Sequence, residues 1–253
     1  MSALHRIFRR KNKVPLACSE IPLEELDNHV HTEACFLDFH ALTVVELYQS
    51  QGCKVCVKNV PKIHDAMINP NIAFLTYNVT YFDRPEWQDT FATKQWDSRQ
   101  RAYVVKWGRT SIFTPQIVVD GVVDGNGQSV NESMGLVDKA RQLRRERDWN
   151  ILLDANETEL RIDSDRSESP PYDILVCFYE SNPQTVKIGK GANKGKKLKH
   201  LNVVQMVSKA GEWNGGNLTI PLPVIPEASN RGWAALAIVQ EPSGGPIVAA
   251  HNL

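Results

Sequence analysis

The stretch ELYQSQGCKVC at residues 46 to 56 places two cysteines, separated by two residues, directly after an apolar run and a polar turn. The run LTVVELY at 42 to 48 is apolar and β-branched, which predicts a buried strand. From Cys53 to Met67 the apolar residues recur at helical spacing. The sequence therefore predicts a strand, a turn and a helix that begins at the first cysteine.

The start of a helix is a favourable place for a reactive cysteine. Unsatisfied backbone N–H groups and the positive end of the helix dipole stabilise a thiolate at Cys53 and lower its pKa. Cys56 lies one turn further along and is placed to attack a mixed disulfide formed at Cys53. Lys54 and Lys58 add positive charge beside the pair. The spacing thus favours a redox couple in which Cys53 attacks and Cys56 resolves.

The following segments predict an alternation of strands and helices. A second apolar strand is expected at residues 71 to 79 and a helix at 93 to 108. Residues 113 to 127 contain two β runs joined at Asp120-Gly121, a hairpin signal that predicts antiparallel neighbours. Asn131 with Glu132 is expected to open a last helix, whose basic final turns suit the negative end of the helix dipole.

After about residue 150 the pattern changes to short apolar runs separated by Gly, Pro, Asn and Lys. Such spacing is typical of an antiparallel β-sandwich. The polar stretch DSDRSESPP at 163 to 171 is expected to be an exposed loop near the boundary. The expected organisation is an N-terminal tail or extension at 1 to 39, an α/β domain at 40 to 149 and an all-β sandwich domain at 150 to 253.

Three residues outside the C-x-x-C pair are candidates for the same site. Thr114-Pro115 directly precedes a predicted strand, and a cis bond there would expose backbone groups to an extended substrate. An ordinary trans proline at the strand entry is the alternative. Glu46 interrupts an apolar strand, and a buried carboxylate beneath a dithiol can shuttle the proton as Cys56 attacks. An exposed Glu46 on an edge strand is the alternative.

An aromatic stretch after the second predicted strand is a candidate substrate shelf. Tyr81, Phe82, Trp87 and Phe91 alternate there with charged residues. They form either a lid beside the dithiol, with Trp87 as a substrate contact, or a satellite hydrophobic cluster.

The order of elements, with C-x-x-C at a helix start and Thr-Pro before a hairpin, resembles the thioredoxin fold over about residues 40 to 148. VELYQSQGCKVC, FTPQIVVDG, the stretch from Tyr77 to Val104, and GANKGKKLKHLNVVQ with GEWNGG also resemble a largely uncharacterised, mostly bacterial and often exported family of thioredoxin-like proteins. The resemblance implies a redox-active pair at Cys53 and Cys56, a cis Pro115 and a β-sandwich in the C-terminal half.

The chain departs from that family at two places. Family members usually follow the second cysteine with residues such as Pro-Pro-Ala-Asp, whereas Val57, Lys58 and Asn59 stand here. They also commonly carry His and Asp where this chain has Asn78 and Thr80. These changes retune the dithiol or remove a second polar site.

A soft-metal site, for copper or zinc, is the alternative use of the cysteines. A C-x-x-C pair supplies half of the ligands in many zinc sites, but this sequence has no second such pair. The order of strand, turn and helix around the pair favours redox chemistry. His29, His31, Cys35 and His40 cluster within DNHVHTEACFLDFH at 27 to 40 and offer ligands for such a metal. Cys18 and Cys35 can instead pair with each other or resolve the active site.

Composition restricts the partners. The 29 basic and 29 acidic side chains cancel, so no overall field favours nucleic acid or an anionic membrane. Five cysteines is an odd count for a disulfide framework and fits a reducing compartment. The expected location is the cytoplasm, although the basic N-terminus also permits a mitochondrial presequence. The lysine-rich segment GKGANKGKKLKH at 189 to 200 fails the phosphate-loop pattern and is expected to be a solvated hairpin tip.

The function predicted from these observations is thiol-disulfide exchange without a cofactor. The expected partners are protein or small-molecule thiols and disulfides, with glutathione as one option. The expected site residues are Cys53, Cys56 and Glu46 as catalytic groups and Thr114, Pro115 and Trp87 as substrate contacts.

Overall fold

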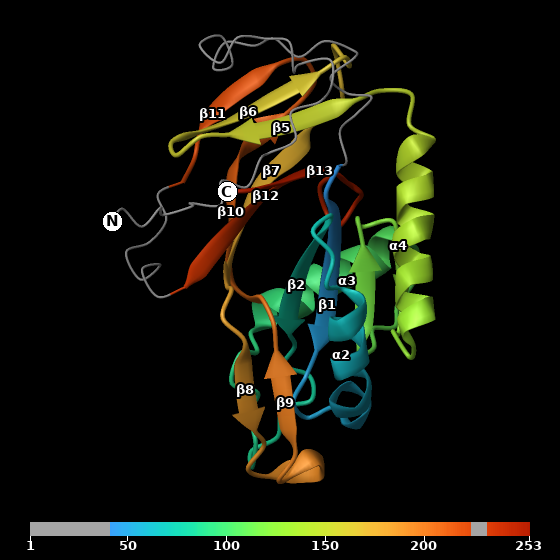
Figure 1. Ribbon diagram of the computed structural model, residues 1–253, viewed down its shortest axis with the longest axis vertical. Coiled ribbons are helices and arrows are strands. Elements are labelled where there is room, and N and C mark those ends of the chain that lie inside the picture. The colour runs from blue at the N-terminus through green and yellow to red at the C-terminus, as the bar shows by residue number, and fades with distance from the viewer. Residues whose placement is uncertain (1–40, 224–231) are drawn as a thin grey trace, which may run out of the picture. The chain divides into compact units, whose positions relative to one another are not determined.

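A computed structural model describes residues 41–223 and 232–253 (Figure 1). The predicted N-terminal extension at 1 to 39, with Cys18, Cys35, His29 and His31, lies outside the described residues, and so does His40. The described chain is a mixed α/β structure with one large sheet and few helices. None of the described helices is long and apolar enough to cross a membrane.

The first half of the chain follows the predicted order of elements. Strand β1 (Thr43–Gln49) is buried at every position and pairs in parallel with β2 (Ile72–Asn78). On its other side β1 pairs antiparallel with β3 (Gln116–Val119), which pairs antiparallel with β4 (Val123–Gly125). The helices of this half are α2 (Lys54–Ala66), α3 (Lys94–Lys106) and α4 (Val130–Arg145).

The hairpin predicted at Asp120-Gly121 is confirmed. The two residues have φ angles of 48° and 66° and join β3 to β4. Two consecutive positive φ angles are typical of tight hairpin turns, where Asp-Gly is favoured. Arg144 and the Val44 N–H both contact the Asp120 carboxylate, so the turn is also tied to α4 and β1.

The second half contributes strands and one short 3-10 turn. They are β5 (Ile151–Ala155), β6 (Glu159–Ser164), β7 (Tyr172–Glu180), β8 (Gln184–Lys187), η3 (Gly191–Asn193), β9 (Lys197–His200), β10 (Val203–Trp213), β11 (Leu218–Pro221), β12 (Trp233–Gln240) and β13 (Ile247–Asn252).

One sheet of eight strands runs across the predicted boundary near residue 150. Its order is β13-β12-β7-β10-β2-β1-β3-β4. The two halves meet where Val203 of β10 pairs in parallel with Thr76 of β2, and the Thr76 N–H donates to the Asn202 carbonyl at 2.9 Å. The strands before and after the boundary therefore share one hydrogen-bonded sheet, while the division into separate domains stays a prediction.

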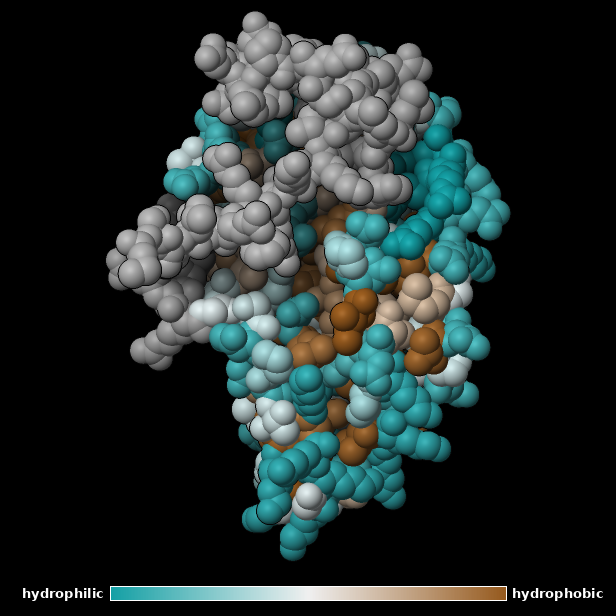
Figure 2. Space-filling model, viewed as in Figure 1, coloured by the Kyte–Doolittle hydropathy of each residue, from teal (hydrophilic) through white to brown (hydrophobic). Residues whose placement is uncertain are grey.

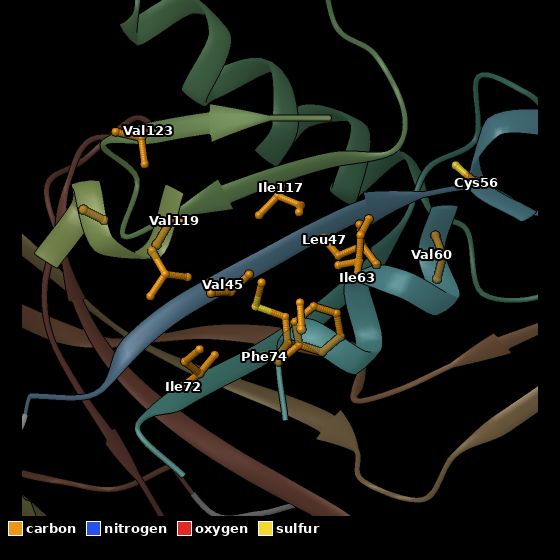
Figure 3. Close-up of a cluster of buried hydrophobic side chains, with 14 of the residues drawn as sticks. Val45, Leu47, Cys56, Val60, Ile63, Ile72, Phe74, Ile117, Val119 and Val123 are labelled. Carbon is orange, nitrogen blue, oxygen red and sulfur yellow. The ribbon is translucent and has the colours of Figure 1, made fainter. Parts of the chain in front are cut away.

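Four clusters of buried side chains fill the layers, the smallest of them formed by Val176, Phe178 and Ala235. One lies between the sheet and helices α2 and α4, and it includes Val45, Leu47 and Cys56 (Figure 3). A second lies on the opposite face of the sheet under α3 and includes Trp96 and Tyr103. The third cluster lies between the three-stranded sheet β11-β6-β5 and strands β7, β10, β12 and β13.

Candidate functional site

The loop between β1 and α2 holds Cys53 at the N-cap of the helix. The Cys53 N–H donates to the Ser50 carbonyl at 3.1 Å, which closes the turn. Gly52 fits here because a Cβ atom at this position would lie 2.8 Å from the Phe82 carbonyl oxygen. The backbone of the aromatic stretch thus packs directly on the loop that carries the cysteine.

The two sulfur atoms lie in unequal environments. The Cys56 N–H donates to Cys53 Sγ at 3.2 Å, and the Cys53 thiol donates to the Thr114 carbonyl at 3.5 Å. A hydrogen bond from the Cys56 thiol, helped by backbone N–H groups and opposed by burial, lowers the pKa of Cys53 to about 6. Burial and the same hydrogen bond raise the pKa of Cys56 well above its usual value. Both thiols are free, and Cys53 is the one that ionises first.

The structure brings the Thr-Pro segment to the cysteines. The Thr114-Pro115 bond is cis, and β3 begins at the next residue. The Tyr81 hydroxyl lies in the same region, donating to the Gln100 side chain at 3.1 Å. The Gln100 amide in turn donates to the Phe113 carbonyl at 2.8 Å. Helix α3 therefore fixes the segment whose Thr114 carbonyl meets Cys53.

Trp87 packs on the β8-β9 hairpin. An added Cβ at Gly189 would lie 2.8 Å from the Trp87 ring, so the two segments are in close contact. The ring also packs on the edge of the cluster that contains Cys53 and Cys56. This placement does not decide between the lid and the satellite cluster, and a substrate contact at Trp87 stays a prediction.

Glu46 is buried, but the structure does not bring it to the dithiol. It pairs across the sheet with Leu75 and Val118, whose side chains belong to the cluster under α3. Its carboxylate accepts from Arg99 Nε at 2.7 Å and from the Tyr103 hydroxyl. The exposed-edge alternative is wrong, since Glu46 is 1% exposed. The proton-shuttle role needs a carboxylate on the cysteine side, and the side chain points to the other face.

Comparison with known proteins now identifies the family. The family model described as "Protein of unknown function (DUF1223)" matches residues 44–240. The chain belongs to the DUF1223 family. The matched range contains the C-x-x-C pair and the Thr114-Pro115 bond. A search of curated proteins finds no match.

Two solved structures resemble this DUF1223 chain. A crystal structure of a protein from Agrobacterium tumefaciens is 26% identical with a TM-score of 0.67, covering 84% of this chain and 94% of that one. The structure of HBP35 of Porphyromonas gingivalis is 15% identical with a TM-score of 0.53, covering 85% of this chain and 75% of that one. At the latter identity the likeness shows the fold alone.

A buried polar network behind the cysteine loop was not anticipated from the sequence. The Gln51 N–H donates to the Asp89 carboxylate at 2.7 Å, and the Asn78 amide donates to the same carboxylate at 2.9 Å. The Gln49 amide lies 2.8 Å from His200 Nδ1, and the Asn193 amide donates to the Gln51 carbonyl at 2.9 Å. In this DUF1223 chain, hydrogen bonds from three segments therefore fix the loop that precedes Cys53.

The lysine-rich hairpin supplies part of this network. His200 is 0% exposed and Asn193 is 1% exposed, although several lysines between them are exposed. The expectation of a solvated tip is thus wrong for these two residues. The signal available in the sequence was the run of polar residues QSQ at 49 to 51, which needs buried partners once the strand before it is buried.

We expect the stability of this DUF1223 chain to fall in acid because of His200. Burial, and then the charge of His64, lower the pKa of His200 from 6.5 to about 3. The unfolded chain therefore takes up the proton first as the pH falls below 6.5, which stabilises the unfolded state by about 3 kcal/mol at pH 4. Urea unfolding between pH 7 and pH 4 measures this loss.

The His200→Gln variant is the control for the acid effect. It should be less stable at pH 7, because it loses buried contacts, but should lose less stability on acidification than the unmodified chain. His64 adds to the effect, since burial lowers its pKa to about 4, so His64→Gln should also flatten the profile. Equal pH dependence in all three proteins would contradict the assignment.

The described part of this DUF1223 chain offers no set of ligands for the soft metal that was considered as an alternative. Among residues 41–223 and 232–253, no group of three or more His, Cys, Asp or Glu side chains is placed to hold a metal ion. The candidate ligands His29, His31, Cys35 and His40 lie outside these ranges. Metal binding by that segment stays a prediction.

Proposed function

We propose that this protein is a thiol-disulfide oxidoreductase on a thioredoxin-like scaffold, with a β-sandwich in its second half. The observation that carries the proposal is the pair of unequal thiols at the start of α2: Cys53 with a pKa lowered to about 6 and Cys56 with a raised pKa. The order β1, α2, β2, α3, β3, β4, α4 with a proline before β3 supports the scaffold assignment.

The reaction begins with the Cys53 thiolate. It attacks one sulfur of a substrate disulfide, forming a mixed disulfide and releasing the other sulfur as a thiolate that takes up a proton. Cys56 then gives up its proton and attacks Cys53 Sγ, which releases the second substrate sulfur as a thiol. The substrate disulfide gains two electrons, and the protein dithiol becomes a Cys53-Cys56 disulfide.

The surroundings of Cys53 support a substrate that approaches over the start of α2. Val55, between the cysteines, is 49% exposed and offers an apolar contact, whereas Cys53 itself is 2% exposed. The Thr114 carbonyl is released when the Cys53 thiol ionises, because a thiolate no longer donates to it. A backbone N–H of an extended peptide or of glutathione can then pair with this carbonyl. A protein disulfide or glutathione is therefore the proposed partner.

The disulfide form must be reduced again for turnover. A reducing compartment such as the cytoplasm supplies thiols for this step. We therefore propose that the protein works in the cytoplasm, where such thiols are present.

The test is a pH series of alkylation on the fully reduced chain, with each cysteine followed by mass spectrometry. Cys53 should react with iodoacetamide with an apparent pKa of about 6. Cys177 is an internal control, because burial raises its pKa to about 11 and it should stay unmodified at neutral pH. A Cys53 that reacts only above pH 8 would contradict the proposal.

A glutathione redox titration of the same chain completes the test. The expected product is a reversible disulfide that maps to Cys53 and Cys56. It should form both in the unmodified chain and in variants that carry Cys18→Ser or Cys35→Ser. A reversible pair between Cys18 and Cys35 alone, or bound metal that blocks the titration, would overturn the proposal.

A further inference from the structure

A cavity of about 230 Å³ lies away from the cysteines, between the C-terminal turns of α4, the residues after that helix and the start of β13. We call it the α4 cavity. Its lining includes Leu143, Arg144, Arg147, Trp149, Tyr172 and Val248. Figure 1 shows α4 standing beside the sheet, and Figure 2 shows hydrophobic side chains at the surface near this helix. The cavity thus combines apolar walls with two arginines.

The two arginines keep unused donors. Arg144 donates to the carbonyls of Ala41 and Leu42 at 3.0 and 3.1 Å and is paired with Asp120. Arg147 donates to the Val248 carbonyl at 3.0 Å. In both side chains the Nε–H is buried and has no hydrogen-bond partner within the described chain. Buried donors of this kind are normally satisfied, because leaving them unpaired costs free energy.

The charges in the cavity do not balance. Among the described residues that line the cavity, two arginines stand against one carboxylate, that of Asp120, which leaves a charge of about +1 from these residues. Burial and the nearby charge of Arg144 lower the pKa of Arg147 to about 10, opposed by Tyr172, Asp120 and Asp165. Trp149 lies under Arg147 at 4.5 Å from its ring centroid and holds the guanidinium at the cavity. A ligand with a single negative charge would complete this arrangement.

We propose that the α4 cavity is a binding site for a small organic carboxylate with an apolar body, a site separate from the dithiol. Arginine recognises carboxylates through the N–H groups of its guanidinium, and both Arg144 and Arg147 line the cavity. Leu143, Tyr172 and Val248 contact the apolar body. The volume exceeds the cavity of about 150 Å³ that takes up benzene in another protein, so an aromatic ring with a short acid chain fits.

The experiment is calorimetric titration of the full chain with 3-phenylpropionate and with its neutral analogue 3-phenylpropanol. The acid should bind at least about tenfold more tightly than the alcohol, because only the acid pairs with the arginines. No binding of the acid at millimolar concentration, or equal binding of acid and alcohol, would overturn the proposal. So would inorganic phosphate that competes as well as the acid, since this would indicate a general anion site.

Three variants locate the binding. Arg147→Met should remove the preference for the acid, whereas Arg145→Met, an exposed neighbour on α4 that does not line the cavity, should keep it. Leu143→Trp should fill the cavity and weaken both probes without changing either arginine. A loss of preference in Arg145→Met equal to that in Arg147→Met, or unchanged binding in Leu143→Trp, would contradict the assignment. Thermal melting of each variant confirms that it is folded.

Discussion

We expect Cys53→Ser to reduce thiol-disulfide exchange by at least about a hundredfold at pH 7. With a pKa of about 6, Cys53 is mostly thiolate at this pH, whereas an ordinary cysteine with a pKa near 8.5 is only about 3% thiolate. The remaining sulfur of the pair is Cys56, which is 0% exposed and has a raised pKa. Cys56 is therefore protonated at pH 7 and does not supply a thiolate for the first attack. Reduction of a small aromatic disulfide by the prereduced protein measures the rate.

Cys56→Ser should behave differently from Cys53→Ser. Its Cys53 can still attack, so the first thiol is released, but the mixed disulfide cannot be resolved and should accumulate at Cys53. The loss of the hydrogen bond from the Cys56 thiol should also raise the pKa of Cys53 toward its usual value. Cys177→Ser is the matched control, because Cys177 is buried in the opposite cluster and should leave the rate unchanged. A mixed disulfide trapped at Cys18 or Cys35 would refute the assignment.

Much of the first half of the fold follows from local sequence. The strand before QSQG, the helix that begins at Cys53 and the hairpin at Asp120-Gly121 each depend on residues within a few positions of one another. The same locality places Cys53 at an N-cap, where backbone N–H groups help the Cys56 thiol to lower the pKa of Cys53. The placement of the cysteine pair at the start of a helix can therefore be predicted without the structure.

The pairing of strands that lie far apart in the chain could not be predicted from the sequence. The contact of Val203 with Thr76 joins segments far apart in the chain, and no periodicity in either segment specifies it. For the same reason the sequence did not place His200 beside Gln49 or Asn193 beside Gln51. These contacts build the support behind the cysteine loop, so the pair itself was predictable and its surroundings were not.

The side of the sheet that Glu46 faces was a separate difficulty. A strand with one exposed face shows alternating polar and apolar residues, which identify its buried side. Every residue of β1 is buried, so the alternation is absent and Glu46 fits either face equally well. The pairing of Glu46 with Leu75 and Val118 shows that its side chain faces the cluster under α3.

We expect Arg99→Met to destabilise the protein by about 3–5 kcal/mol. The change would leave the Glu46 carboxylate buried without its charged partner, and removing one member of a buried ion pair carries a penalty of this size. It would also remove the hydrogen bond from Arg99 to Gln240 and the contacts of the guanidinium with the rings of Tyr77 and Tyr103. Urea unfolding of the reduced protein at pH 7 measures the free energy of unfolding.

Two comparisons separate the buried charge from other effects of that substitution. Glu46→Leu combined with Arg99→Met should be more stable than Arg99→Met alone, because no unpaired charge remains. Lys106 lies on the same helix as Arg99 and forms an exposed pair with Glu241, so Lys106→Met should cost less than about 1 kcal/mol. Glu46→Gln should leave the second exchange step at its original rate, since the side chain lies across the sheet from Cys56. A slower release of the second thiol in Glu46→Gln, with stability preserved, would restore the proton-shuttle role and show that the carboxylate acts through the sheet.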